Sequence, residues 1–188
     1  MLNAQYQFKL IEAGCDEVGR GCIAGPVVAA AVILPPEYKN KFIIDSKKIS
    51  QKKRKELGQE IIDNAISWSI SEVSNNKIDE INILNASILA MHRALDKLKV
   101  RPEFIIVDGN KFRPYNKISH ECIIKGDNKF QNIAAASILA KNYRDDLMKK
   151  LSIKYNKYSW ESNFGYPTKK HRDSIKKNGT TKYHRKSF

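Results

Sequence analysis

The first part of the chain contains two short runs of mostly apolar residues. Residues 10–18 form a mostly apolar run that ends in two acids, and residues 26–35, PVVAAAVILP, form a second apolar run bracketed by prolines. Short apolar runs of this kind are typical of buried strands. Because only a short glycine-containing stretch separates the runs, we expect the two strands to pair as a hairpin.

Helical spacing begins after Ser50, a residue type that favours the N-cap position. The segment that follows carries apolar residues at helical spacing, namely Leu57, Ile61, Ile62 and Ile66. The later elements predicted from periodicity are strands over residues 67–74, 104–107 and 120–126 and helices over residues 85–98 and about 129–154. This order of elements predicts an α/β fold with a mixed sheet.

The chain changes character after residue 154. Residues 155–188 are aromatic and basic, and two glycines and a proline interrupt them. We expect one short helix here, over residues 168–177, packed against the main sheet. With 188 residues and 41% hydrophobic content, the chain can bury one substantial core.

Charge and cysteine content narrow the class of protein. Lys and Arg number 34 against 20 Asp and Glu, for a net charge of +14, so a polyanion such as nucleic acid is the expected partner. The alternative is a protein whose charge only maintains solubility. Cys15, Cys22 and Cys122 form no CxxC pair, which favours a reducing cytosol. No targeting leader or apolar span is apparent, so we expect a cytoplasmic protein.

Asp16 and Glu17 end the first strand, and Gly19 and Gly21 follow closely. Neighbouring side chains of a strand point to opposite faces unless the chain leaves strand geometry, which the glycines permit. Carboxylates are ligands for Mg²⁺ or Mn²⁺, although such a pair is also common in solvated turns. The glycine spacing weakly matches a dinucleotide fingerprint, but Pro26 and an apolar run follow where a helix should begin.

Two further acids change this picture. Asp108 ends the buried strand over residues 104–107, and Asp127 lies between a predicted strand and the long helix. Carboxylates at the ends of neighbouring strands converge at one edge of an α/β sheet. Four such acids can hold two divalent ions that support an in-line displacement at phosphorus.

Several short motifs, taken together and in order, resemble ribonuclease HII. They are DEVGRG at residues 16–21, DSKKIS at 45–50, IIVDGN at 105–110, KGDNK at 125–129, AAASILAKNYRD at 134–145 and FGYPTKKH with HRKSF at the C-terminus. The resemblance covers about residues 10–188. It implies a ribonuclease H-like fold, with a five-stranded mixed sheet flanked by helices. Residues 1–154 would form the catalytic domain, and residues 155–188 a basic C-terminal helical extension packed on the same domain.

The resemblance also implies an activity. Members of this family hydrolyse the RNA strand of RNA–DNA hybrids and nick duplex DNA 5′ of single embedded ribonucleotides, leaving 3′-hydroxyl and 5′-phosphate ends. Matched by motif, Asp16, Glu17, Asp108 and Asp127 would be the catalytic set and would bind two Mg²⁺ or Mn²⁺ ions. These are the four acids that their positions at strand ends had already selected.

For the substrate, the resemblance assigns the GRG sequence, Gly19, Arg20 and Gly21, to recognition of the ribose 2′-hydroxyl. Glycines let the backbone approach such a group closely. Tyr166 would stack on the deoxyribose next to the ribonucleotide, or else only pack the C-terminal helix onto the sheet. Lys47 would reach a backbone phosphate, or else belong to a solvated basic face.

Basic residues of the tail predict a duplex-binding surface; they are Lys169, Lys170, Arg172, Lys176, Lys177, Lys182, Arg185 and Lys186. The four histidines lack metal-ligand spacing and are interpreted as structural or phosphate-facing. Ser137, Lys141, Arg144 and Asp145 of the long helix are interpreted as partly structural.

Partners and competing functions complete the expectations. Some archaeal relatives extend beyond the HRKSF-like end with a peptide for a sliding clamp; this chain stops at that motif, so a clamp interaction through the C-terminus is doubtful. A monomer is expected. Two other functions stay open: a non-catalytic basic module that binds nucleic acid, and a different nuclease or integrase on the same fold.

Overall fold

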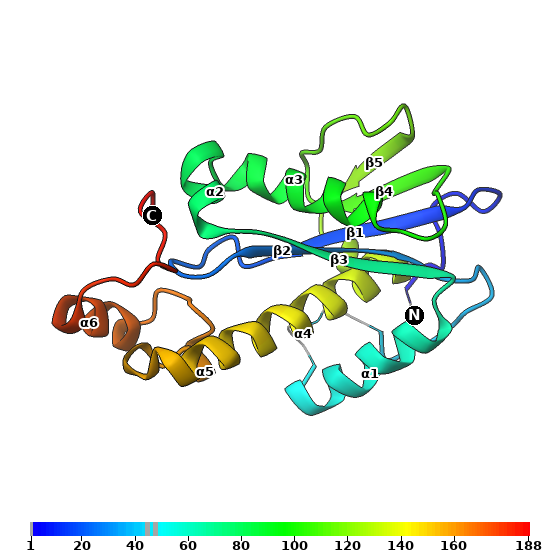
Figure 1. Cartoon of the computed structure of the whole chain (residues 1–188). Helices are drawn as coiled ribbons and strands as arrows, with labels where there is room; N and C mark the ends of the chain where they lie inside the picture. Colours follow the sequence, from blue (N-terminus) through cyan, green and yellow to red (C-terminus); the bar gives the residue numbers. More distant parts are fainter. Residues whose placement is uncertain (1, 44–45, 47–48) are drawn as a thin grey trace.

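The computed structural model describes residues 2–43, 46 and 49–188. A five-stranded mixed sheet lies at its centre, with the strands in the order β3-β2-β1-β4-β5. β1 pairs antiparallel with β2, and β2 pairs antiparallel with β3. β1 pairs parallel with β4, and β4 parallel with β5. Figure 1 shows α2 and α3 on one face of this sheet and α1 and α4 on the other, so the predicted five-stranded mixed sheet flanked by helices is confirmed.

The elements of the described residues follow one another as β1 (Glu12–Val18), β2 (Val27–Ile33), α1 (Gln51–Asn64), β3 (Ser67–Val73), α2 (Asn75–Ile81), α3 (Ile83–Asp96), β4 (Phe104–Asp108), β5 (Ser119–Ile123), the 3-10 turn η2 (Gly126–Asn128), α4 (Gln131–Lys154), the 3-10 turn η3 (Asn156–Tyr158), α5 (Trp160–Asn163) and α6 (Lys169–Asn178).

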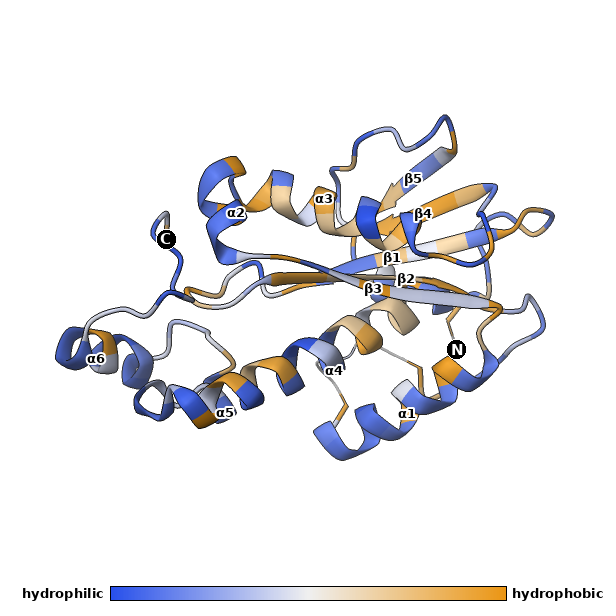
Figure 2. Cartoon of the chain, viewed as in Figure 1, coloured by the Kyte–Doolittle hydropathy of each residue, from blue (hydrophilic) through white to orange (hydrophobic). Residues whose placement is uncertain are grey.

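The strand β2 is buried on both faces, which explains its continuous apolar sequence. Alternate side chains along it enter two separate cores: Val27 and Ile33 pack with α3, whereas Val28 and Val32 pack with α1 and α4. Figure 2 shows hydrophobic residues along β2 and β4 and hydrophilic residues over most of α1 and α6. The hydrophobic effect therefore holds both helical layers against this central strand.

The N-terminal half of α4 packs directly on β1. At Gly14 a β-carbon would overlap the backbone of Asn132 and Ile133, so only glycine lets the helix approach this closely. The Asn132 side chain accepts a hydrogen bond from the Leu34 amide at 3.0 Å and donates one to the Glu12 carbonyl at 3.2 Å. These contacts fix the start of α4 on the strand that carries Asp16.

Two helices begin with a hydroxyl cap, of which Ser50 was predicted from the sequence and Thr168 was not. The Ser50 hydroxyl accepts from the Lys53 amide at the start of α1, and the Thr168 hydroxyl accepts from the His171 amide at the start of α6. A hydroxyl at the N-cap satisfies one of the amides that the first helical turn leaves unpaired.

The helices differ from the sequence-based expectations in two places. The short helix α2 was not predicted, because Ile78 and Ile81 are its only apolar residues and cannot establish a period. The tail was expected to hold one helix, but α5 and η3 precede α6. They form around Trp160, which is fully buried against Met148 of α4 and Ala24 of the β1–β2 connection. Among the helices of the described residues, none has the length and apolar character needed to cross a membrane.

Candidate active site

The carboxyl ends of β1 and β4 lie side by side. Cys15 pairs in parallel register with Val107, so the next residues of the two strands, Asp16 and Asp108, are neighbours across the sheet. The carboxyl edge of such strands is where α/β folds place their ligands. We call this position, with Glu17 and Asp127, the carboxylate edge.

Asp16 and Glu17 point to opposite faces of the sheet. β1 keeps its strand geometry through both residues, because Asp16 pairs with Ala30 and Glu17 with Ala29 of β2. The Asp16 carboxyl accordingly accepts a hydrogen bond from Ser137 of α4, whereas Glu17 lines a pocket formed with α3. The two acids therefore enclose the sheet edge from both sides, as strand alternation requires.

Two acids of this edge, Asp16 and Glu17, have raised pKa values. Burial raises the pKa of the Asp16 carboxyl well above its usual value, and the negative charges of Glu17 and Asp108 raise it further. Burial also raises the pKa of Glu17, against the opposing effect of Arg20, whose Nη1 lies 3.1 Å from Glu17 Oε1. Crowded carboxylates of this kind favour a bound cation, which would relieve their repulsion.

Asp127 is attached to the same edge through the backbone. It lies in η2 and is 7% exposed, and the Asn128 side-chain amide donates to its Oδ1 at 2.9 Å. The amide of Gly126 donates to Asp108 Oδ1 at 2.7 Å. The turn that carries Asp127 is thereby fixed against the end of β4.

These four carboxyl groups fit a divalent cation by their chemistry, since hard oxygen donors are what Mg²⁺ and Mn²⁺ prefer. Within the part of the chain that the structure describes, however, no three His, Cys, Asp or Glu side chains are gathered closely enough to hold a metal ion. The arrangement brings the four acids to one edge without closing them into a finished ligand shell.

The turn after β1 holds its two glycines in different surroundings. Gly19 has a φ of +93°, and a β-carbon there would overlap Nε of Arg144. At Gly21, a β-carbon would meet no heavy atom within 4 Å. Gly19 is thus required by backbone conformation and packing, whereas Gly21 leaves an open face beside the carboxylate edge. The Arg20 side chain is half exposed and pairs with Glu17.

Tyr166 lies against this GRG turn. The Ile23 amide donates to the Gly165 carbonyl at 2.9 Å, and the Tyr166 hydroxyl interacts with the Cys22 thiol, which contributes to the raised pKa of Tyr166 after the larger effect of burial. Lys141 Nζ lies 5.9 Å from the centre of the tyrosine ring. Lys47, the other predicted substrate contact, lies outside the described residues.

One predicted basic surface residue is in fact buried. Arg185 was expected on the duplex-binding surface of the tail, but it is 4% exposed and its guanidinium donates to backbone carbonyls of the GRG turn. Its neighbour Arg144, expected to be partly structural, is fully buried beside it. Composition alone could not separate these two residues from the many solvated arginines and lysines.

Two histidines of the tail are structural, as interpreted. Nδ1 of His171 bonds to the Tyr166 carbonyl at 2.9 Å, and Trp160 Nε1 donates to His171 Nε2 at 3.0 Å. His184 Nδ1 accepts from the Thr181 amide at 2.8 Å. Both rings are buried in an aromatic cluster, so they hold the tail together.

A pocket of about 260 Å³ opens beside the carboxylate edge. Glu17 and Asp108 line it on the sheet side, and Ser87 of α3 lines it on the other. Ser87 is 1% exposed, and its hydroxyl has no hydrogen-bond partner among the described residues. The sequence did not single out this serine, because it lies within an ordinary amphipathic helix.

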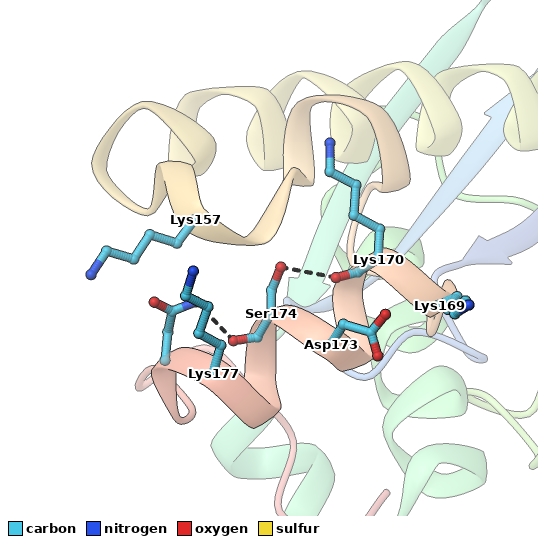
Figure 3. A pocket seen from close by; sticks show the side chains of 7 residues that line it. Lys157, Lys169, Lys170, Asp173, Ser174 and Lys177 are labelled. Carbon is cyan, nitrogen blue, oxygen red and sulfur yellow. Dashed lines mark hydrogen bonds between the residues drawn. The ribbon is translucent and has the colours of Figure 1, made fainter.

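A second, larger hollow lies in the C-terminal tail. It measures about 870 Å³, and Lys157, Lys169, Lys170 and Lys177 line it together with Asp173. Figure 3 shows Lys157 approaching this hollow from the segment before α5 and Lys170 and Lys177 from α6. Its positive charge agrees with the predicted polyanion-binding character of the tail.

Comparison with known proteins gives the same family over nearly the whole chain. The family model for ribonuclease HII matches residues 13–188. The curated protein named ribonuclease HII of Christiangramia forsetii is 61% identical over 188 residues, which are 100% of this chain and 94% of that protein.

Solved structures of two archaeal proteins share the fold. The PCNA:RNase HII complex of Archaeoglobus fulgidus matches with a TM-score of 0.80 and 27% identity, and covers 95% of both chains. The ribonuclease H2 of Pyrococcus horikoshii matches with a TM-score of 0.78 and 26% identity, and covers 94% of this chain and 93% of its own.

Proposed function

The chain belongs to the ribonuclease HII family and is therefore a ribonuclease H-type endonuclease, and we propose that it nicks duplex DNA on the 5′ side of a single embedded ribonucleotide, besides cleaving the RNA strand of RNA–DNA hybrids. The observation that carries this proposal is the contact between the acids and the GRG turn. The same strand that ends in Asp16 and Glu17 continues into that turn, and Arg20 pairs with Glu17 at 3.1 Å. A sugar bound at the turn would lie beside the acids that act on its phosphate.

Asp16, Glu17, Asp108 and Asp127 would hold two Mg²⁺ or Mn²⁺ ions. Such ions supply an activated water and stabilise the leaving 3′-oxygen, which gives 3′-hydroxyl and 5′-phosphate products. The chain's own contribution is to keep the carboxylates in place, whereas bound cations would offset the raised pKa of Asp16 and Glu17. The Ser137 hydroxyl lowers the pKa of Asp16 against the effect of burial, and the Gly126 amide holds Asp108 at 2.7 Å.

The substrate-binding set would be Gly19, Arg20, Gly21, Tyr166 and Lys47. Gly21 has open space in front of it, so a ribose can approach the backbone there, and a 2′-hydroxyl can both donate to and accept from peptide groups. Tyr166 lies within reach of the same turn and is half buried, which leaves one part of its ring available for a deoxyribose.

The tail would bind the duplex away from the cleavage site. We divide the chain into the catalytic domain, residues 1–154, and the basic extension, residues 155–188, on the support of the buried cluster that joins Trp160 to Met148 of α4. The relative from Archaeoglobus fulgidus is solved in complex with PCNA. In this chain the amides of Lys186 and Ser187 donate to Asp79 of α2 at 3.0 and 2.9 Å, which supports the view that this segment does not serve as a clamp-binding peptide.

The test compares three duplexes of one sequence: all DNA, DNA with one ribonucleotide, and an RNA–DNA hybrid. With Mg²⁺ or Mn²⁺ we expect cleavage of the second and third but not the first, and a single nick 5′ of the embedded ribonucleotide. Asp108→Asn should abolish cleavage and keep duplex binding. Asp173→Asn, which changes an exposed acid of α6, should keep cleavage. A wild-type protein that leaves the single ribonucleotide intact with both ions refutes the proposal.

A further inference from the structure

The three side-chain nitrogens of Arg185 each donate a hydrogen bond to a backbone carbonyl in or near the GRG turn. Nη2 donates to the Gly19 carbonyl at 2.7 Å, Nη1 to the Arg20 carbonyl at 2.9 Å and Nε to the Gly25 carbonyl at 3.0 Å. The side chain is 4% exposed. The planar guanidinium fork suits this task, because it fixes several acceptors at once.

These contacts orient the peptide groups of the turn. A trans peptide points its N–H opposite to its C=O, so the carbonyls of Gly19 and Arg20 that face Arg185 direct the amides of Arg20 and Gly21 the other way. Neither amide has a hydrogen-bond partner among the described residues. The space beside Gly21 is open, so these two donors are available to a sugar that approaches the turn from the side opposite Arg185.

Arg144 holds the rest of the same region. It donates to the carbonyls of Pro26 at 2.9 Å and Ala24 at 3.0 Å, and to the Phe164 carbonyl, two residues before Tyr166, at 2.8 Å. It is 0% exposed. Arg144 thus joins the turn to the tyrosine segment, whereas Arg185 is the arginine that contacts the Gly19 and Arg20 carbonyls within the GRG turn. The Gly19 carbonyl also accepts from the Cys22 amide, at the longer distance of 3.4 Å.

Burying these guanidinium groups is expensive. Within the described part of the chain neither arginine forms a salt bridge, and burial lowers the pKa of Arg185 to about 10. An apolar side chain would fill the same space without the cost of desolvating a charge. What an apolar side chain cannot do is fix the direction of three carbonyls.

The segment that carries Arg185, residues 183–187, is itself tied down. Its backbone bonds to the β1–β2 connection, with the Arg185 amide donating to the Ile23 carbonyl at 2.9 Å. At its other end, Asp79 of α2 accepts from the amides of Lys186 and Ser187 and from the Ser187 hydroxyl at 2.6 Å. The backbone at Arg185 and at the two residues that follow it is therefore fixed, which fixes the position of the guanidinium.

We infer that Arg185 is a positioning residue for ribonucleotide selection: by holding the carbonyls of Gly19 and Arg20, it presents the amides of Arg20 and Gly21 as paired donors to the ribose 2′-oxygen. Lysine at this position would keep the charge but could not engage three separate carbonyls. The inference rests on the proposed function of the GRG turn and adds the residue that sets the turn's geometry.

The test measures binding and not only cleavage. In an Asp108→Asn background, the affinities for an all-DNA duplex and for the same duplex with one ribonucleotide give the ribonucleotide preference of each variant. We expect Arg185→Lys to keep the all-DNA affinity within about twofold and to lose about tenfold or more of the preference, as the loss of aligned hydrogen bonds implies. Thr180→Ala, which changes an exposed residue of the same tail that contacts neither the turn nor Asp79, should keep the preference.

Asp79→Asn supplies a second variant, because it loosens the segment without contacting the turn. Its preference should fall in the same direction, with unchanged all-DNA affinity. The inference is overturned if Arg185→Lys keeps the ribonucleotide preference of the wild type, or if it weakens binding to both duplexes equally. If Arg185→Lys does not fold, an unchanged preference in Asp79→Asn overturns the inference. A wild-type protein without any preference refutes the proposed function instead.

Discussion

Gly19 and Gly21 should respond very differently to alanine. At Gly19, a φ of +93° strains an alanine by about 1–2 kcal/mol, and its β-carbon would overlap Nε of Arg144. That nitrogen donates to the Pro26 carbonyl at 2.9 Å, and loss of such a charged hydrogen bond costs about 1.5–3 kcal/mol. Together these terms lower the free energy of unfolding by about 4 kcal/mol, or roughly 8–16 °C in Tm for a chain of this size.

Gly21→Ala should leave the fold intact, because the new methyl group meets no heavy atom within 4 Å. Its Tm should stay within about 2 °C of the wild-type value, as for most exposed substitutions. The methyl group would instead occupy the space through which a ribose approaches the turn. We expect kcat/KM for a duplex with one ribonucleotide to fall by about 10- to 100-fold, since small displacements at a reacting centre are costly.

Gly179→Ala is the matched control. Gly179 follows α6 with a φ of +76°, and a β-carbon there meets nothing within 4 Å, so it carries the backbone strain without the overlap. Thermal unfolding followed by circular dichroism and cleavage of the ribonucleotide duplex would be measured for all three variants. The reasoning fails if Gly19→Ala is no less stable than Gly179→Ala, or if Gly21→Ala cleaves as the wild type does.

Three further predictions concern charge. Asp145→Asn should lower the free energy of unfolding by about 3 kcal/mol, because Asp145 is 1% exposed and its Oδ2 lies 2.6 Å from Nη2 of buried Arg54; a chemical denaturation midpoint equal to that of the wild type would contradict it. Burial lowers the pKa of His184 to about 4 from 6.5, so its contribution to stability is complete above pH 6.5 and is lost as the pH falls toward 4. The Tm of His184→Gln should therefore fall less steeply than that of the wild type across this window, and parallel curves would exclude the effect. Replacing Lys170 and Lys177 by glutamine should reduce the slope of log K against log salt for duplex binding by up to about 2, which a titration at several salt concentrations would detect.

The main elements, and the positions of Asp16 and Asp108 at the ends of neighbouring strands, could be predicted because their signals are local. The continuous apolar sequence of β2 reports burial on both faces, and Asp108 ends the most clearly apolar strand. The observed helix boundaries differ from the predicted ones by a few residues where a cap sets the end of the helix. The helix predicted over residues 85–98 begins at Ile83, because Asn82, with a φ of 65°, caps it.

The properties of the GRG turn could not be predicted, since they depend on residues far away in the sequence. Nothing near Gly19 and Gly21 indicates that one faces a buried arginine and the other open space. Nor does the sequence around Arg185 distinguish it from Lys186, which is exposed. Whether a basic residue is solvated or buried is decided by the tertiary contacts of the tail.

The bonds between Arg185 and the GRG turn join residues that are 165 and 166 positions apart. During translation at about 5–20 residues per second, Arg185 is synthesised on the order of 10 s after the GRG turn that it contacts. Asp108 and Asp127 leave the ribosome well before that. The four acids would thus all be available while the carbonyls of the turn still lack this partner. If Arg185 orients the turn as we infer, the geometry of the GRG turn is the last part of the proposed site to form.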